Sequence, residues 1–219
     1  LSVSAERLVG AEIVFDLVTV TGTENLMLAA TLADGVTILR NAAMEPEVVD
    51  LAKCLLAMGA KITGVGTETI RIEGVASLSG FDHAVMFDRI EAGTYMTAVA
   101  ATGGELLLKG VDTNIISSIT SKLAGAGAVI KHEGDNLLLI VSGRLNPIDV
   151  ETAPYPGFPT DMQAQFMALD TIADGTSTIS ETIFENRFMH VQELTRLGAK
   201  IEIQGNMAVI QGVSSLTGA

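Results

Sequence analysis

The chain has 219 residues and a formal net charge of −13, from 13 basic and 26 acidic residues. Its composition, 48% hydrophobic and 4% aromatic with no tryptophan, predicts one large or two small ordered domains with aliphatic cores. The acidic balance argues against a nucleic-acid partner, no apolar run reaches the roughly 18–20 residues that span a bilayer, and no signal-peptide pattern is visible.

Three copies of one pattern follow each other with a period of about 70 residues. Each copy reads as a small-residue helix, a DG or GG turn, a strand, a second helix that ends at Gly-Ala, and two more strands joined by a hairpin. The pattern is carried by LAATLADGVTILRN (28–41), LLAMGAKI (55–62) and TETIRIEGV (67–75); by AVAATGGELLLKG (98–110), KLAGAGAVI (122–130) and DNLLLIVSG (135–143); and by ALDTIADGTSTISE (168–181), LTRLGAKI (194–201) and NMAVIQGV (206–213).

The two helices of each copy differ in their apolar pattern. In VVDLAKCLLAMGA (48–60), Val48, Leu51, Leu55 and Met58 fall at helical spacing, which predicts an amphipathic helix with one buried stripe. MLAATLA (27–33) and MTAVAA (96–101) are apolar nearly all round, which predicts helices buried on every side. We therefore expect pseudo-threefold packing, with the sheets outside and the alanine-rich helices inside.

The first helices of the three copies start at GT (22–23), GT (93–94) and PTD (159–161). Converging helix N-termini would form an anion site. The third start lies in FPTDMQAQF (158–166), where Pro159 and Thr160 precede Asp161. Asp161 has two readings at this point: a helix N-cap, or a carboxylate held rigidly as a general base. In the second copy, Asp88 with Arg89 and Glu91 reads as a capping group rather than a ligand set.

Four segments together resemble a known family: NAAMEPEVVDLA (41–52), DRIEAGTY (88–95), FPTDMQAQF (158–166) and FENRFMHVQEL (184–194). They occur in the order found in the enolpyruvyl transferases and are most similar to UDP-N-acetylglucosamine 1-carboxyvinyltransferase (UDP-N-acetylglucosamine enolpyruvyl transferase). The related 5-enolpyruvylshikimate-3-phosphate synthase shares the fold but is less similar in these segments. The resemblance implies an inside-out α/β barrel built from βαβαββ-type repeat units. It makes residues 1–85 the last unit of one barrel half and residues 86–219 two units of the other. The alternative is a single three-unit domain over residues 1–219.

The resemblance also implies an activity and its residues. The family transfers the enolpyruvyl group of phosphoenolpyruvate to the 3-hydroxyl of UDP-N-acetylglucosamine, the first committed step of peptidoglycan synthesis, in the cytoplasm and without a cofactor. Asp161 matches the aspartate that deprotonates this hydroxyl. The further positions matched to the substrate cleft are Leu17, Val18, Thr19 and Val20, against the uridine part, Ile183, against the nucleotide sugar, and Glu185 and Arg187. Leu17 departs from the family, which often has lysine there.

Some family features have no counterpart in this sequence. We find no loop with the reactive cysteine, no Lys-Asn pair near a chain start and none of the arginines that hold phosphoenolpyruvate. The lone cysteine, Cys54, lies on the amphipathic helix and excludes an internal disulfide, and the three histidines lack metal-ligand spacing. We therefore expect a portion of the enzyme that is inactive alone. A non-catalytic assembly fragment is the alternative, and unpaired strand edges would favour a homodimer.

Overall fold

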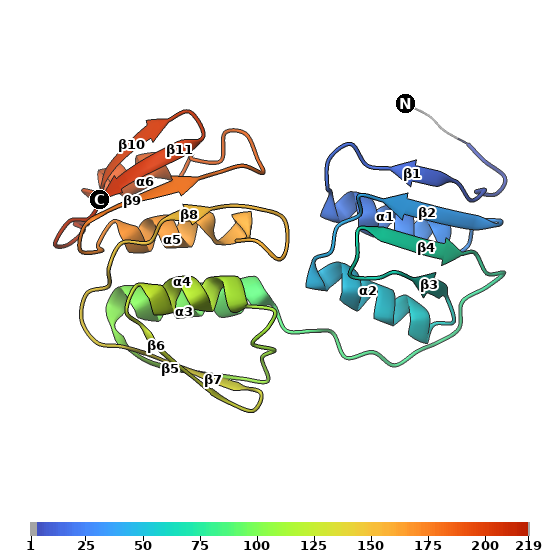
Figure 1. Cartoon of the computed structure of the whole chain (residues 1–219), viewed down its shortest axis with the longest axis horizontal. Coiled ribbons are helices and arrows are strands. Elements are labelled where there is room, and N and C mark those ends of the chain that lie inside the picture. Colours follow the sequence, from blue (N-terminus) through green and yellow to red (C-terminus); the bar gives the residue numbers. More distant parts are fainter. Residues whose placement is uncertain (1–3, 219) are drawn as a thin grey trace. The chain divides into compact units, whose positions relative to one another are not determined.

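The computed structural model describes residues 4–218, which fold as two compact units that meet in sequence between Met86 and Phe87 (Figure 1). Both units are mixed α/β. Within the described residues, no helix combines the length and apolar character needed to cross a membrane.

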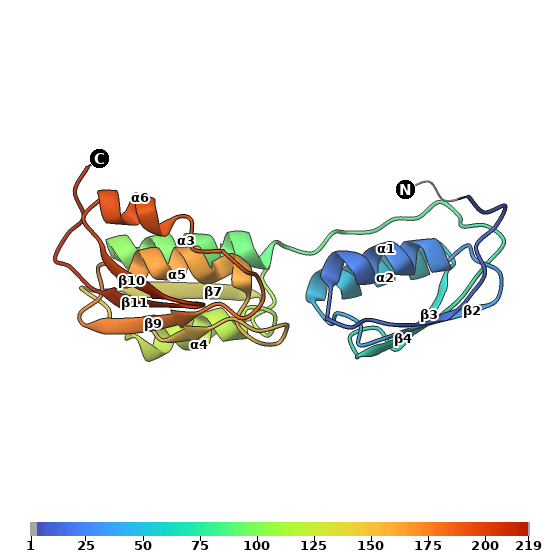
Figure 2. The same cartoon turned by 90° about the horizontal axis from the view of Figure 1, so that it is seen from above.

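Unit 1 is a four-stranded sheet with two helices on one of its faces, as Figure 2 shows. The strands lie in the order β1-β2-β4-β3; β1 is parallel to β2 and the other neighbours are antiparallel. In chain order its elements are β1 (Glu12–Val14), α1 (Val20–Ala30), β2 (Val36–Arg40), α2 (Pro46–Ala57), β3 (Lys61–Thr63) and β4 (Thr69–Glu73). Met27 of α1 packs with Leu39, Ile70 and Ile72 of the sheet, and all four are fully buried.

Unit 2 holds two sheets. In chain order its elements are α3 (Arg89–Thr102), β5 (Gly104–Lys109), α4 (Ser117–Gly125), β6 (Val129–Glu133), β7 (Asn136–Val141), β8 (Val150–Glu151), the 3-10 helix η1 (Thr160–Met162), α5 (Gln163–Asp170), β9 (Thr176–Ser180), α6 (Val191–Arg196), β10 (Lys200–Gln204) and β11 (Met207–Gln211). The sheets run β5-β7-β6 and β8-β9-β11-β10. Helix α3 packs on α5, and each also packs on a strand of its own sheet, so that both lie between the sheets (Figure 1).

The same local rules shape each copy of the pattern. After α2, α4 and α6, the chain leaves the helix through Gly59, Gly127 and Gly198, each with positive φ between 95° and 108°, a conformation that glycine adopts without a Cβ clash. The next two strands then form an antiparallel hairpin in every copy. The predicted glycine ends of the second helices are thereby confirmed.

Two expectations about the first helices and one about the sheets need correction. The helices start earlier than the GT pairs: Thr19 caps α1 and Asp88 caps α3, where the Asp88 carboxylate accepts the N–H groups of Ile90 and Glu91 at 2.8 and 3.0 Å. They are also not buried all round, since Leu28 of α1 is 45% exposed and Tyr95 of α3 is 58% exposed. Among the described residues the three sheets remain open and separate, so these residues form a mixed α/β fold and do not show the expected inside-out α/β barrel.

Candidate active site

Asp161 lies in a short 3-10 turn at the entrance to α5, with its side chain 57% exposed. Buried aromatic rings fix the chain on both sides of it: Phe158 and Phe166 meet edge to face with centroids 4.8 Å apart. The N-cap reading is wrong, because Pro159 occupies the cap position of the 3-10 turn and Met162 that of α5. The backbone around Asp161 is therefore held between buried rings, and Asp161 is the cap residue of neither helix.

Arg187 is the partner of that carboxylate. Its Nη2 donates to Asp161 Oδ1 at 2.6 Å, and its Nη1 donates to the Thr160 hydroxyl at 2.8 Å. The guanidinium also lies over the Phe184 ring, 5.1 Å from its centroid, a geometry that holds a cation by its attraction to the ring face. Asp161 and Arg187, predicted as separate site residues, thus form one ion pair.

A second carboxylate, that of Glu181, lies beneath this pair at the end of β9 and is 3% exposed. Its Oε1 accepts from the Thr152 hydroxyl at 2.9 Å and from the N–H groups of Ile183 and Phe184 at 2.9 and 3.1 Å. Its Oε2 accepts from the Thr160 hydroxyl at 2.8 Å. Four donors compensate the buried charge, which would otherwise be costly.

Ile183 and Glu185 lie on the segment that leads from Glu181 to Arg187. Ile183 is 37% exposed and its N–H is one of the Glu181 donors. Glu185 is exposed. Asn186 follows with a φ of 57°, a left-handed conformation that asparagine tolerates better than most residues, and this turn precedes Arg187.

The remaining predicted residues belong to unit 1, in the connection from β1 to α1. Leu17 is 81% exposed and Val18 is 37% exposed. The Thr19 hydroxyl accepts the Gly22 N–H at 3.2 Å and so caps the helix, and Val20 is the first helical residue. The structure therefore gives Thr19 a structural task and leaves the Leu17 side chain open to solvent.

His190 lies near the ion pair at the start of α6. It is half-buried, and burial lowers the pKa of its imidazole, with the Arg187 charge as a second cause. Both effects disfavour the protonated ring. The imidazole of His190 is therefore harder to protonate beside Arg187 than an exposed histidine.

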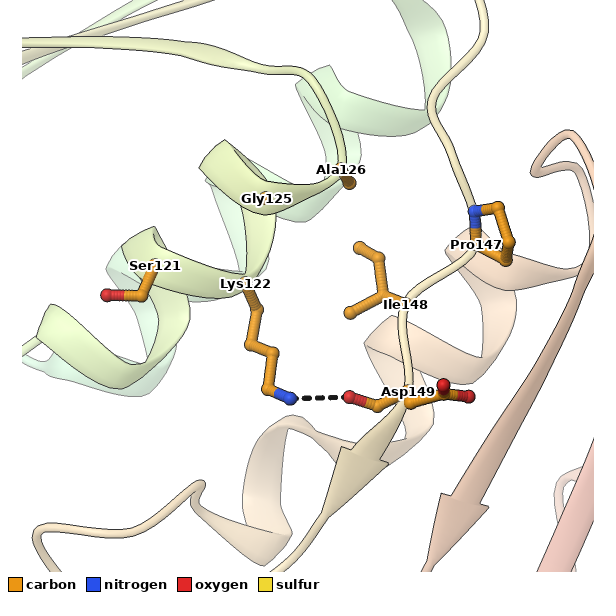
Figure 3. A pocket seen from close by; sticks show the side chains of 7 residues that line it. All are labelled: Ser121, Lys122, Gly125, Ala126, Pro147, Ile148 and Asp149. Atoms are coloured by element: carbon orange, nitrogen blue, oxygen red, sulfur yellow. Dashed lines mark hydrogen bonds between the residues drawn. The ribbon is translucent and has the colours of Figure 1, made fainter.

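Unit 2 also has a shallow pocket away from the ion pair (Figure 3). It is lined by Ser121, Lys122, Gly125, Ala126, Pro147, Ile148 and Asp149. Its Lys122 ammonium donates to the Asp149 carbonyl at 2.5 Å, and the Asp149 carboxylate accepts the N–H and hydroxyl of Thr178. These bonds hold the segment before β8 to α4 and β9, so we assign the pocket no chemistry. Nowhere in residues 4–218 do three His, Cys, Asp or Glu side chains gather as metal ligands.

Sequence reasoning missed Thr160 and Glu181 as members of the site. One signal could have found Glu181. Alternate residues of β9 face inward, and Ser177 and Ile179 are buried; the same period of two places Glu181 inward. A charged residue at an inward position needs bonding partners and so marks a polar cluster.

Comparison with known proteins agrees with this architecture. The model of the EPSP synthase family (3-phosphoshikimate 1-carboxyvinyltransferase) matches residues 1–219. Among solved structures, the chain is similar to the enolpyruvyl transferase NikO from Streptomyces tendae, with a TM-score of 0.81 and 23% identity over 95% of this chain and 52% of that one. An EPSP synthase from Acinetobacter baumannii matches with a TM-score of 0.46 and 17% identity, over 97% of this chain and 50% of that one. The chain thus spans about half the length of the structures it matches.

Proposed function

The chain belongs to the EPSP synthase family of enolpyruvyl transferases, and we propose that it carries part of the acceptor-substrate site for enolpyruvyl transfer to UDP-N-acetylglucosamine. The observation that carries the proposal is the exposed Asp161 carboxylate, fixed at 2.6 Å from Arg187. The long segments around both residues resemble the nucleotide-sugar enzymes, which supports this acceptor.

The geometry suits a positioned general base. One Asp161 oxygen, Oδ1, accepts from Arg187, and the other is available to accept a proton from a substrate hydroxyl. A sugar hydroxyl is a poor nucleophile, and it becomes a better one as a nearby carboxylate accepts its proton. Arg187 keeps the carboxylate oriented for this step, because its Nη2 donates to Oδ1 at 2.6 Å. Ile183, on the same hydrogen-bonded segment, would contact the nucleotide sugar.

We further propose that Leu17, Val18, Thr19 and Val20 of unit 1 contact the uridine part, and that Glu185 lines the cleft. In this proposal unit 1 is the last unit of one barrel half and unit 2 is two units of the other. The division of the chain between Met86 and Phe87 supports this assignment. Peptidoglycan synthesis in the cytoplasm is the role that such a substrate implies.

The second candidate acceptor is shikimate 3-phosphate. The family whose model matches the chain is described as 3-phosphoshikimate 1-carboxyvinyltransferase. This description favours shikimate 3-phosphate as the acceptor. The two acceptors differ chemically, since one offers a nucleotide and an N-acetyl sugar and the other a phosphorylated carboxylate ring. A chain of net charge −13 offers little long-range attraction to either anion, so local contacts must decide.

Ligand titration of the 219-residue chain tests the proposal. We expect UDP-N-acetylglucosamine to shift backbone amide NMR signals at residues 160–161 and 183–187 in a saturable way. Asp161→Asn should weaken this binding about tenfold, whereas the control Asp174→Asn, at an exposed carboxylate of the same unit, should leave it unchanged. Tighter binding of shikimate 3-phosphate, or no binding of either acceptor at millimolar concentration, would contradict the proposed acceptor.

We also propose that the isolated chain does not turn over, because the sequence lacks counterparts of the family's cysteine loop and phosphoenolpyruvate arginines. A coupled phosphate-release assay should show no activity above background. Release at the rate of a complete family enzyme would refute this. Self-association as a homodimer stays a prediction, to be tested by analytical ultracentrifugation; a monomer at high concentration would count against it.

A further inference from the structure

Glu181 bonds to both segments of the site at once. Its Oε2 receives the Thr160 hydroxyl beside Asp161, and its Oε1 receives the N–H groups of Ile183 and Phe184 on the Arg187 segment. We propose that Glu181 is a positioning residue that, through the Thr160 hydroxyl, aims Arg187 at Asp161. The inference rests on the proposed function only for the identity of the ligand; the contacts themselves are independent of it.

The direction of the hydrogen bonds makes Thr160 a relay. A hydroxyl has one proton to donate and two lone pairs to accept with. The Thr160 proton is directed to Glu181 Oε2 at 2.8 Å, because an ionised carboxylate can only accept. The oxygen of Thr160 therefore presents its lone pairs to Arg187 Nη1, also at 2.8 Å.

The planar guanidinium passes this orientation on to Asp161. Its two Nη atoms belong to one rigid fork, so that fixing Nη1 on Thr160 also fixes the direction in which Nη2 donates to Asp161 Oδ1. The Phe184 ring supports the guanidinium face, and the N–H of this same residue is anchored by Glu181. Besides Asp161, Arg187 is thus oriented by the Thr160 hydroxyl and the Phe184 ring, and the buried Glu181 carboxylate is hydrogen-bonded to both of these residues.

A purely structural carboxylate would stabilise the end of β9 without affecting Arg187. A substitution at Thr160 distinguishes the positioning role of Glu181 from a purely structural one, because it leaves Glu181 itself unchanged. Thr160→Val keeps the shape of the side chain and removes the hydroxyl, while three donors to Glu181 Oε1 remain. Thr160→Ser keeps the hydroxyl and should preserve the relay.

The matched control is Thr97→Val. Thr97 is a buried threonine of unit 2, whereas Thr160 is half-buried, and the Thr97 hydroxyl donates to the Gly93 carbonyl within α3. It is a partner of neither Glu181 nor Arg187 in the hydrogen bonds of the described chain. Its replacement tests what the loss of a buried threonine hydroxyl does to the unit by itself.

The experiment uses the 219-residue chain and records the side-chain NMR signals of the Arg187 guanidinium without ligand. An immobilised guanidinium gives separate, slowly exchanging Nη signals, and a mobile one gives a single averaged signal. We expect separate signals in the parent, Thr160→Ser and Thr97→Val chains and averaged signals in Thr160→Val. UDP-N-acetylglucosamine binding should weaken about tenfold in Thr160→Val and less than twofold in the other two variants.

The outcomes separate the positioning role from the proposed ligand. Separate Arg187 signals in Thr160→Val would overturn the positioning role, whatever the ligand result. Averaged signals in Thr160→Val with separate signals in Thr160→Ser would support it, even if the parent chain fails to bind UDP-N-acetylglucosamine and the proposed acceptor falls. If circular dichroism shows Thr160→Val to be unfolded, Glu181→Gln replaces it, because the amide oxygen keeps the three Oε1 donors and only the Oε2 acceptor is lost.

Discussion

The buried carboxyl of Asp170 should make the stability of unit 2 depend on pH. Asp170 ends α5, is 1% exposed and accepts the Ile148 N–H at 2.9 Å. Burial raises the pKa of this carboxyl from 3.8 to about 7; the Ile148 N–H and the Ser177 hydroxyl oppose the rise, and the Asp149 charge adds to it. The folded chain therefore holds a proton between about pH 4 and pH 7 that the unfolded chain releases.

The sign and size of the effect follow from this difference. Because the folded-state pKa lies above the unfolded value, the contribution of Asp170 to the free energy of unfolding is complete below about pH 4 and is lost as the pH rises through 7. A difference of about 3 pKa units at about 1.4 kcal/mol each corresponds to roughly 4 kcal/mol in total. About 2.5 kcal/mol of this falls between pH 5 and pH 8.

The substitution Asp170→Asn removes this pH-dependent contribution to the free energy of unfolding. The asparagine side chain stays neutral at every pH and keeps an oxygen to accept the Ile148 N–H. From pH 5 to pH 8 the parent chain should lose roughly 2.5 kcal/mol of its free energy of unfolding through Asp170, and the variant should not. The difference in free energy of unfolding between variant and parent should therefore grow by this amount over the range. Urea unfolding followed by tyrosine fluorescence measures it within unit 2, because the chain lacks tryptophan and both of its tyrosines, Tyr95 and Tyr155, lie in that unit.

Asp174→Asn, at a side chain that is 78% exposed, is the control for the general effect of removing a negative charge from the acidic unit. It should show little change in its stability difference across the same pH range. A stability difference between Asp170→Asn and the parent that stays constant within about 0.5 kcal/mol from pH 5 to pH 8 would refute the raised pKa and the burial argument behind it.

Three further predictions concern packing, backbone geometry and charge in unit 2. Phe166→Ala removes a fully buried ring and should cost about 3–5 kcal/mol in urea unfolding; a loss below 1 kcal/mol would contradict the packing. Gly212→Ala would place a Cβ 1.9 Å from the Ala173 carbonyl oxygen and should cost about 1–3 kcal/mol in the same assay, so an unchanged midpoint would show that the strand end lies elsewhere. The His190 ring should titrate below its usual range in NMR, since burial is the main cause, and Arg187→Gln should raise the midpoint only slightly; a normal midpoint in the parent would place the ring in solvent.

Local sequence patterns were sufficient for most of the element order. Glycine pairs, amphipathic spacing and alternating strands depend on residues within a few positions of each other, which is why the helix–strand–helix–hairpin order of each copy and the glycine helix ends could be predicted. Helix starts were less well predicted. The GT pairs resemble starts, but the hydrogen bonds of Thr19 and Asp88 place the caps three to five residues earlier.

Burial around the first helices depended on more than composition. An alanine-rich helix is compatible with burial on every side, but whether each face is covered depends on which elements pack against it. In the described chain α3 is covered by α5 and by strands of its sheet, while Tyr95 remains 58% exposed.

The sequence by itself determined that Asp161 stands at a stiff helix entrance, and through resemblance it named Arg187 and Ile183 as companions. Only the tertiary structure decided that Arg187 bonds to both Thr160 and Asp161, and that Glu181 holds the two segments together. The partners are 21 to 27 positions apart. Contacts at such separations depend on strand register and on the path of the loops, and neither is specified by local periodicity. The carboxylate that sequence presented as a cap or a base is, in the folded chain, one end of a hydrogen-bonded relay.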